Sequence, residues 1–504
     1  MPSTELEFVR LDGRRREALF QQIYESIRQS ILAGKLKPGV RLPSSRDLTQ
    51  QWGVSRTTVV AAIDRLVAEG YLHSVRGSGT FVSDEMSEEC LCASVPWTPP
   101  GANESQDNPA ESRNVLRTSE VSDFGAELMS IDKVNADTAA PEAFCPGEPA
   151  TDAFPMDVWS KIVRGVWKRV RPVDLTYGEP AGQLPLRRSI ASYLQRHRGV
   201  RCEPRQVMIV GGTQQGVDLV SRLLVSPGDR VLFENPGYVS ARDAIEKAAG
   251  RIVCMPVDEH GACVSAGTAL TPQAKLAYVT PSHQYPIGAT MPIERRLELL
   301  AWASDSKAWI LEDDYDSEYR YGQQPIPAMQ GLDASGRVIY VGSFSKVVFP
   351  ALGLGYVIVP PQLVEVFENA LRLASRPGSQ IDQLVLSEFI REGHFGRHLR
   401  RMRRIHAQRR LAFVEGVRSL LSDRLTIIGS QAGLHCAALL KSKKSDVRIV
   451  RELGQAGITA RALSEYYHPS TPTKDRLKGL VFGFACVAPA QIKKGLAKVA
   501  EVVC

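Results

Sequence analysis

The chain has 504 residues, of which 43% are hydrophobic and 23% charged, and this composition is typical of a folded protein with several domains. No apolar run is long enough to span a membrane, and the N-terminal residues lack the apolar core of a signal peptide. We therefore expect a cytoplasmic protein without membrane contact. The nine cysteines are scattered, and the close pair Cys90 and Cys92 matches no common zinc spacing, so we expect reduced thiols and no metal.

The net charge of +7 is unevenly distributed along the chain. Residues 1–83 carry 12 Lys and Arg against 8 Asp and Glu, whereas residues 84–134 carry 3 against 11. This pattern indicates a basic head, an acidic connector and a basic body. Because residues 84–134 are rich in Pro, Asn, Ser and Glu, we predict that they form an extended or disordered linker.

Residues 14–83 predict a compact, mainly helical domain. Leu19, Ile23, Ile27 and Ile31 repeat every four residues, so they form one apolar stripe on a first helix, which Gly34 and the following Pro-Gly pair end. A second helix is predicted over 45–52, with Ser44 as its N-cap.

A tight turn at Gly53 leads from the second helix to a third. Ser55 is the expected N-cap of this helix, which runs to about Glu69. A short ribbon follows, with residues 76–79 at its tip and residues 80–82 returning. Two helices joined by a tight turn and followed by a ribbon predict a winged helix-turn-helix.

Such a domain reads DNA with side chains at helix N-termini and at the wing tip. Free backbone amides there bind phosphate, arginine can grip guanine, and a threonine methyl can contact thymine. The expected DNA-binding residues are Ser44, Ser45, Arg46, Arg56, Thr57, Thr58, Arg76 and Gly77. The alternative from spacing alone is a helical interaction module whose arginines are merely solvated.

From about residue 135 to 504 the pattern changes to that of a multidomain α/β protein. Apolar runs typical of strands alternate with helical stretches, which predicts a largely parallel sheet. From about residue 375 long helices and a few short strands indicate a smaller subdomain. The expected strands are 207–210, 230–233, 275–279, 308–311 and 338–341.

Two of these runs are followed by residues with cofactor chemistry. Lys346 comes after 338–341 and lies near two hydroxyl residues, Ser343 and Ser345. A lysine in this setting can form a Schiff base with an aldehyde, and the hydroxyls can hold a phosphate. Asp313 is expected just after 308–311, where its carboxylate can pair with a pyridinium nitrogen.

Two further strand ends complete the pattern. Gly212 and Thr213 form a glycine turn after 207–210, which directs helix N-terminal amides at a phosphate. Tyr238 follows 230–233 and offers a ring for stacking. Each motif alone is common in surface loops, but together at strand ends they predict a site for pyridoxal 5′-phosphate (PLP).

Two segments of the sequence resemble known protein families. The segment LKPGVRLPSSRDLTQQWGVSRTTVVAAIDRLVAEGYLHSVRGSGTFV closely resembles the DNA-binding domain of the GntR family. Residues 140–504 resemble the fold-type I (class I/II) aminotransferases, which have a large and a small subdomain. The whole chain therefore resembles the MocR/GabR subfamily of regulators.

This resemblance implies roles for individual residues. It implies that Lys346 forms the Schiff base with PLP, that Asp313 bonds the pyridine nitrogen, and that Tyr315 lies near the cofactor hydroxyl. It places Tyr238 by the ring, and Tyr177 at the phosphate of a dimer partner's site. It also implies a homodimer that binds a double-stranded DNA operator with repeated half-sites.

The sequence departs from the family pattern at two positions. Gly353 stands where an arginine that helps to hold the cofactor is expected, and Val481 stands where aminotransferases carry the arginine for the substrate carboxylate. The candidates for gripping a ligand carboxylate are Arg242, Arg461 and Arg476.

Three functions remain open from the sequence. The first is a transcriptional regulator that senses an amino compound or PLP through its aminotransferase-like domain. The second is a working PLP-dependent aminotransferase with an attached DNA-binding head. The third is a regulator whose second domain has lost PLP and serves as a scaffold, which only Gly353 favours.

One basic segment fits none of these motifs. Residues 396–410 predict a helix with seven arginines, which favours a solvated or dimer-interface helix. The alternative is an auxiliary contact with DNA. The arginines are Arg397, Arg400, Arg401, Arg403, Arg404, Arg409 and Arg410.

Overall fold

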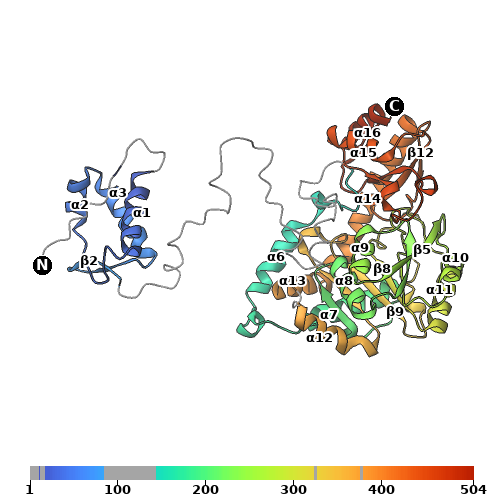
Figure 1. Ribbon diagram of the computed structural model, residues 1–504, viewed down its shortest axis with the longest axis horizontal. Coiled ribbons are helices and arrows are strands. Elements are labelled where there is room, and N and C mark those ends of the chain that lie inside the picture. The colour runs from blue at the N-terminus through green and yellow to red at the C-terminus, as the bar shows by residue number, and fades with distance from the viewer. Residues whose placement is uncertain (1–10, 12–17, 84–143, 323–325, 375–377, 504) are drawn as a thin grey trace. The chain divides into compact units, whose positions relative to one another are not determined.

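The computed structural model describes residue 11 and residues 18–83, 144–322, 326–374 and 378–503. The chain forms two compact units, 1–120 and 121–504, each of which is described by itself below (Figure 1). The predicted linker 84–134 lies outside the described residues. Among the helices of the described ranges, none is both long and apolar enough to cross a membrane.

The N-terminal unit has the predicted order of elements. Three helices, α1 (Leu19–Leu32), α2 (Ser45–Trp52) and α3 (Arg56–Ala68), precede the antiparallel ribbon of β1 (Leu72–Val75) and β2 (Gly79–Val82). Their apolar faces meet in one core, which confirms Ile23, Ile27 and Ile31 of the predicted stripe as the buried side of the first helix, whereas Leu19 at its start is half-buried. The core includes Ile23, Ile27, Ile31, Leu48, Val59, Ile63 and Leu66.

Local capping explains where these helices begin. The Ser44 hydroxyl accepts a hydrogen bond from the amide of Asp47 (3.2 Å), and the Asp47 carboxylate accepts one from the Ser44 amide (3.2 Å). This capping box fixes the start of α2. Ser55 accepts a hydrogen bond from the amide of Thr58 (3.2 Å) at the start of α3, and Gly53 between them adopts a left-handed conformation with φ +63°. Both predicted N-caps are confirmed.

The second unit is built on an eight-stranded sheet with the order β3-β10-β9-β8-β7-β4-β5-β6. The pairs among β4, β5, β7, β8 and β9 are parallel, whereas β10 is antiparallel to both neighbours and β6 is antiparallel to β5. The predicted α/β sheet is thus confirmed. The strands are β3 (Val207–Val210), β4 (Arg230–Asn235), β5 (Arg251–Asp258), β6 (Gly261–Ala262), β7 (Leu276–Val279), β8 (Trp309–Asp314), β9 (Val338–Ser343) and β10 (Gly355–Ile358).

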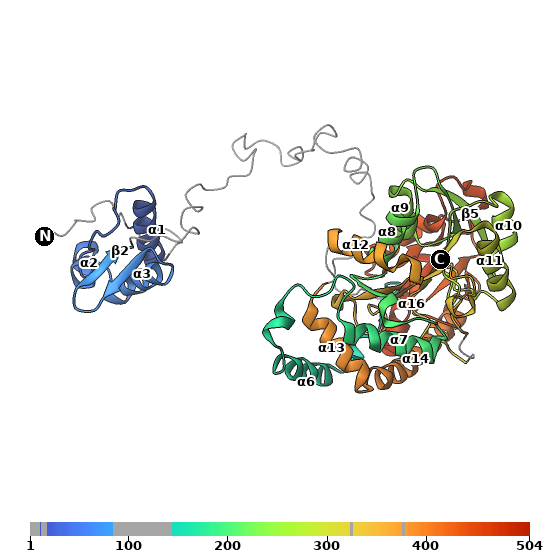
Figure 2. The ribbon, with the colours of Figure 1, turned by 90° about the horizontal axis from the view of Figure 1, so that it is seen from below.

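Helices cover both faces of this sheet (Figure 2). Along β3, Met208 and Val210 pack with one set of helices, and Val207 and Ile209 with the other, because successive side chains of a strand point to opposite faces. The first face carries α8 (Thr213–Leu224), α9 (Val239–Lys247) and α12 (Val364–Ala374). The other carries α7 (Leu184–Arg198), α10 (Val264–Leu270) and α11 (Ile293–Ser306).

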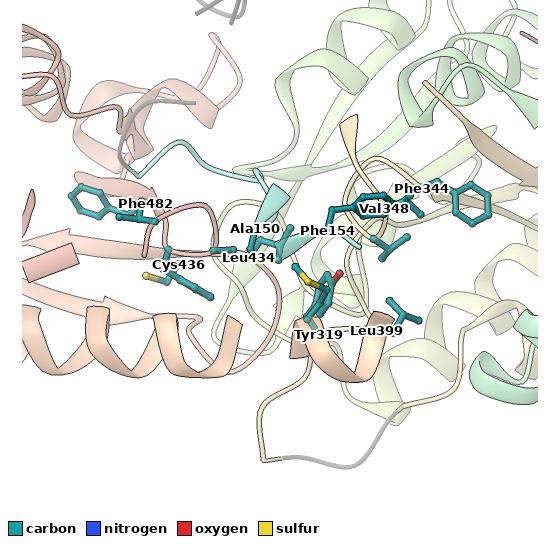
Figure 3. Packing of buried hydrophobic residues seen from close by; sticks show 14 of the residues in the cluster. Ala150, Phe154, Tyr319, Phe344, Val348, Leu399, Leu434, Cys436 and Phe482 are labelled. Carbon is teal, nitrogen blue, oxygen red and sulfur yellow. The ribbon is translucent and has the colours of Figure 1, made fainter. Parts of the chain in front are cut away.

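The C-terminal part of this unit has its own antiparallel sheet, in the order β11-β12-β14-β13. One continuous core joins it to the large sheet: Phe344 and Val348 come from the large-sheet side, and Leu434, Cys436 and Phe482 from the small one (Figure 3). The elements from residue 378 onward are α13 (Gln380–Arg391), α14 (His394–Leu421), β11 (Leu425–Ile428), β12 (His435–Leu440), α15 (Asp446–Gln455), β13 (Arg461–Ala462), β14 (Gly479–Gly483) and α16 (Pro489–Val503). The earlier helix α6 (Met156–Trp167) packs against α13.

Three strands end later than the sequence predicts. Glu312, Asp313 and Asp314 lie within β8 rather than just after it, β4 continues to Asn235, and β9 continues to Ser343. Acidic residues are usually solvated, but here protein groups donate a hydrogen bond to at least one oxygen of each carboxylate. The Glu312 carboxylate, for example, accepts hydrogen bonds from the amides of Met329 and Gln330 (2.8 Å each).

Candidate functional site

A cavity of about 1020 Å³ opens where the parallel strands of the large sheet end. Thr280 follows β7, Asp313 lies at the end of β8, Ser343 ends β9, and Gly211 follows β3. Open α/β sheets bind ligands at this edge, because loops there are free to diverge. Apart from Tyr177, all eleven cofactor and carboxylate residues predicted in this unit line the cavity: Gly212, Thr213, Tyr238, Arg242, Asp313, Tyr315, Ser343, Ser345, Lys346, Arg461 and Arg476.

Lys346 lies on the wall of this cavity, just beyond β9. Its neighbours Val347 and Val348 are buried in the main core, and the Tyr319 hydroxyl donates a hydrogen bond to its carbonyl oxygen (3.3 Å). Its amino group lies close to Gly147, where a Cβ would stand 3.4 Å from Nζ. Gly147 has φ +80°, so glycine suits this close approach both sterically and conformationally.

Asp313 offers an unsatisfied acceptor at the same cavity. The Tyr278 hydroxyl donates to its Oδ2 atom (2.7 Å), but its buried Oδ1 atom has no hydrogen-bond partner within the described ranges. Burial raises the pKa of Asp313 to about 7. A buried carboxylate oxygen without a partner is costly, and a cationic N–H donor would remove that cost.

The glycine turn and two serines form a part of the cavity wall that could bind an anion. Gly212 has φ +122° and precedes α8, so the turn presents the free amides of a helix N-terminus. Ser343 accepts a hydrogen bond from the amide of Ser345 (3.1 Å). Gly353 has φ +58°, and nothing lies within 4 Å of where its Cβ would stand. The left-handed backbone, not lack of space, therefore favours glycine over arginine there.

A buried polar cluster supports Tyr315. Its hydroxyl donates to the carbonyl oxygen of His283 (2.8 Å), and Nδ1 of His283 lies 3.1 Å from both carboxylate oxygens of Asp316. His435 packs against the His283 ring, with 4.7 Å between ring centroids. His283, Asp316 and His435 each offer a ligand atom within 4.8 Å of the others, so this cluster could hold a metal ion. No spacing in the sequence indicated it.

The three candidate arginines differ in their contacts. Arg476 donates to the carbonyl oxygens of Thr471 (2.9 Å) and Pro469 (3.0 Å), so it holds its own loop. Arg242 donates to the carbonyl oxygen of Tyr467 (3.2 Å). Arg461 lies on β13 directly opposite Val481 of β14. It therefore reaches the cavity from the strand beside the position where the arginine was expected.

The N-terminal unit exposes most of its predicted DNA-binding residues. Arg46, Arg56, Thr57, Arg76 and Gly77 are exposed, Ser44 is exposed while its side chain caps α2, and Ser45 and Thr58 are half-buried. The hydroxyls of Thr57 and Thr58 contact Ser55 (2.7 and 2.8 Å). Arg41 also lies against the wing, since its Nε atom is 2.7 Å from where a Cβ on Gly79 would stand. Arg41 was not among the residues predicted from the sequence.

Comparison with known proteins identifies both units. The bacterial regulatory proteins of the gntR family match residues 19–82, and the aminotransferases of class I and II match residues 149–478. The probable rhizopine catabolism regulatory protein MocR of Rhizobium meliloti is 37% identical over 480 residues, covering 95% of this chain and 92% of that protein. The chain belongs to the MocR subfamily of GntR-type transcriptional regulators.

Other relatives agree with this assignment. The pyridoxine biosynthesis regulator PdxR of Corynebacterium glutamicum is 32% identical over 485 residues, covering 96% of this chain and 95% of that protein. Among solved structures, kynurenine aminotransferase of Pyrococcus horikoshii superposes with a TM-score of 0.67 at 25% identity, covering 77% of this chain and 95% of that one. LysN of Thermus thermophilus superposes with a TM-score of 0.70 at 23% identity, which shows the fold.

Tyr177 is not part of the cavity in this MocR-type chain. It is 80% exposed and lines a separate depression with Arg171, Thr176 and Glu179. Its predicted place at a partner subunit's site requires a dimer and stays a prediction.

The sequence also missed several residues that build the cavity. Tyr278 holds Asp313, the hydroxyls of Tyr285 and Tyr466 lie 3.1 Å apart at its wall, and buried Glu234 accepts a hydrogen bond from the Thr280 hydroxyl (2.5 Å). Burial raises the pKa of Glu234 to about 7.

Proposed function

We propose that this regulator binds PLP in the cavity of its second unit and that occupancy of the cavity controls DNA binding by the head. The observation that carries the proposal is the unpartnered Oδ1 atom of Asp313, at the wall that also carries Lys346. The residues present fit the cofactor, because a carboxylate, a lysine and an anion-binding helix end line one cavity.

Each group then has a task. Lys346 supplies the amine that attaches the cofactor, Asp313 accepts from its ring nitrogen, and Tyr315 serves the ring hydroxyl. Gly212 and Thr213, with Ser343 and Ser345, serve the phosphate, and Tyr238 flanks the ring. When bound, PLP supplies an aldehyde that condenses reversibly with primary amines and a ring that withdraws electrons.

The signal is an amino compound or PLP itself. Two relatives are named as regulators of rhizopine catabolism and of pyridoxine biosynthesis, which supports either kind of signal. A primary amine could displace Lys346, and one of the three arginines that line the cavity, Arg242, Arg461 or Arg476, would grip a ligand carboxylate.

The DNA-binding task falls to the head. Ser45 and Arg46 at the start of α2 and Arg56, Thr57 and Thr58 at the start of α3 contact the operator, with Arg76 and Gly77 at the wing. The regulator acts as a homodimer, so its operator contains repeated half-sites. In that dimer Tyr177 reaches the partner's cofactor.

Aminotransferase activity is the second candidate function. The presence of Lys346, Asp313 and Tyr315 in one cavity favours it, but Val481 is buried and apolar where those enzymes carry their carboxylate-binding arginine. Turnover of amino and keto acids at the rate of a dedicated aminotransferase would favour this function over regulation.

Two variants of the full-length protein separate the tasks. Lys346→Ala should lose the visible absorbance band of lysine-bound PLP and every amine-dependent change in DNA affinity, while still binding DNA. Arg56→Ala with Thr57→Ala should keep the band and lose specific DNA binding, measured by fluorescence anisotropy. A Lys346→Ala protein that keeps both the band and the amine response would refute the proposal.

A further inference from the structure

The basic segment of α14 contains two kinds of arginine. The first kind holds the fold. Arg409 is buried and donates to the carbonyl oxygen of Ala485 (2.7 Å) and to the carboxylate of Asp152 (2.5 Å). Arg410 donates to the carbonyl oxygen of Ser430 and lies over the Tyr321 ring, 5.5 Å from its centroid. Arg403 is exposed, but it donates twice to the carbonyl oxygen of Glu318 (3.1 and 2.9 Å) and so belongs to the same kind.

The second kind lies on the surface. Arg400, Arg401 and Arg404 are exposed and form no hydrogen bond or ion pair within the part of the chain that the structure describes. Arg397 is also exposed and donates to the carbonyl oxygen of Glu392 (3.2 Å). We call Arg397, Arg400, Arg401 and Arg404 the arginine stripe.

The spacing places the stripe on one helix face. Positions 397, 400, 401 and 404 follow the i, i+3, i+4, i+7 pattern, so their side chains are neighbours. Like charges at this spacing repel one another and destabilise the helix. No acidic residue occurs anywhere from 394 to 410 to offset them. A bound anion would offset this repulsion, because it would attract each of the guanidinium groups.

The dimensions of the stripe suit a polyanion. At 1.5 Å per residue it extends about 10 Å along the helix, and duplex DNA carries about one charge per 1.7 Å of its axis, so several phosphates lie within reach. Guanidinium groups bind phosphate through paired hydrogen bonds. The same chain carries a DNA-binding head, so we infer that the polyanion is DNA.

We propose that the arginine stripe is a second DNA-binding surface, which contacts the phosphate backbone of duplex beside the operator. This inference rests on the proposed function of the head. The stripe adds affinity that depends on the length of the duplex and on salt but carries no sequence preference, because phosphate contacts do not read bases.

The test uses the full chain and a duplex selected by it from random sequences. The selected site is compared with the same site extended by two helical turns on each side, over a series of salt concentrations. The parent should bind the longer duplex several-fold tighter. Arg400→Gln with Arg401→Gln and Arg404→Gln should lose this gain, and the salt slope on the long duplex should fall by up to about 3.

Two control proteins make the result specific. Changing the exposed Lys493, Lys494 and Lys498 of α16 to glutamine removes the same charge elsewhere and should leave the length-dependent gain intact. Changing the three arginines to lysine keeps the charge and should restore most of the salt slope.

Each other outcome contradicts the proposal. An unchanged gain and slope in the glutamine variant would show that the stripe does not touch DNA. A changed oligomeric mass would instead make it an interface between copies of this chain. If the parent selected no duplex at all, the proposed function of the head would itself fail, and the stripe's role would fail with it.

Discussion

The DNA-binding head and the cofactor cavity are built from contacts of very different range along the chain. In the head, the decisive hydrogen bonds join residues three apart, as between Ser44 and Asp47 or Ser55 and Thr58. In the cavity, Tyr278 holds Asp313 from 35 residues away, and Asp316 accepts from the amide of Leu434 across 118 residues. The ends of the helices in the head are therefore determined by short sequence segments, whereas the cavity forms only when the second unit has folded.

The buried ion pair behind the cavity tests this contrast most strongly. Arg198 lies 2.8 Å from the Asp314 carboxylate and donates to the Ser282 hydroxyl (2.8 Å) and the Ile326 carbonyl oxygen (2.7 Å). Arg198→Ala leaves a buried charge unpaired, so we expect a loss of about 4 kcal/mol in the free energy of unfolding of the second unit. Urea unfolding of the full chain measures it.

The matched control is Arg205→Ala. Arg205 pairs with Glu203 on the surface, where both side chains are about two-thirds exposed, so the loss should stay below about 1 kcal/mol. Equal losses in the two variants would mean that burial does not set the strength of these pairs.

The head should respond to damage in its own core alone. Leu48 is fully buried between α2 and the other helices, and Leu48→Ala should destabilise the head by about 3 kcal/mol. DNA affinity should fall with the population of folded head, while PLP binding, followed by absorbance, stays unchanged. Val75→Ala, at a position that is 46% exposed, is the control, with an expected change within about 0.5 kcal/mol. Loss of PLP binding in Leu48→Ala would mean that damage to the core of the head also affects the second unit.

The pH dependence of stability distinguishes the cavity from the head in another way. Burial raises the pKa of Asp313 to about 7, so the folded protein keeps a proton there that the unfolded chain has released. The stability that this bound proton contributes is therefore fully present below the pKa that Asp313 has in the unfolded chain. It is lost as the pH rises through the pKa that Asp313 has in the folded protein. When the pH rises from 5 to 6.5, the free energy of unfolding of Asp313→Asn should increase by about 2 kcal/mol relative to that of the parent, both without PLP.

Urea unfolding of the cofactor-free proteins at both pH values measures this difference. Added PLP should reduce it, because the ring nitrogen favours the charged carboxylate. The control Asp218→Asn alters an exposed carboxylate that pairs with Arg222, and it should show no such trend. A stability difference for Asp313→Asn that does not change with pH would mean that the carboxylate is already ionised in the folded protein.

The contrast also explains how much the sequence predicted. Helix ends in the head were predicted within a residue because Ser44, Ser55 and Gly53 act through neighbouring backbone groups. Five of the eight strands of the sheet were found from their apolar runs, whereas β5, β6 and β10 were not predicted. Three of the five end later than predicted, at Asp314, Asn235 and Ser343, since nothing local shows that a polar residue will be buried within a strand. Lys346, Asp313 and Tyr315 were found because their family places them in fixed motifs.

Other features of the cavity had no local pattern. In the sequence, Tyr278 is one residue of an apolar run that predicts a strand. Nothing near it in the sequence indicates that its hydroxyl donates a hydrogen bond to Asp313. Arg461 lies on a two-residue strand, and its place opposite Val481 depends on the pairing of β13 with β14. The positive φ of Gly353 follows from the turn after a short 3₁₀ helix. All three depend on tertiary structure.

The smallest expected effect separates a cap from a DNA contact within the head. Ser44→Ala removes the hydroxyl that accepts from the Asp47 amide, so the head should lose about 1 kcal/mol of stability. Ser45 is the next residue, and its side chain makes no hydrogen bond to the start of α2 within the described residues, so Ser45→Ala should leave stability within about 0.5 kcal/mol. Both serines are predicted to contact DNA, so both variants should bind it more weakly. Thermal unfolding and anisotropy on the same samples measure the two effects. If Ser45→Ala destabilised the head as much as Ser44→Ala, the capping box would not be what fixes α2, and even this most local part of the fold would depend on contacts elsewhere.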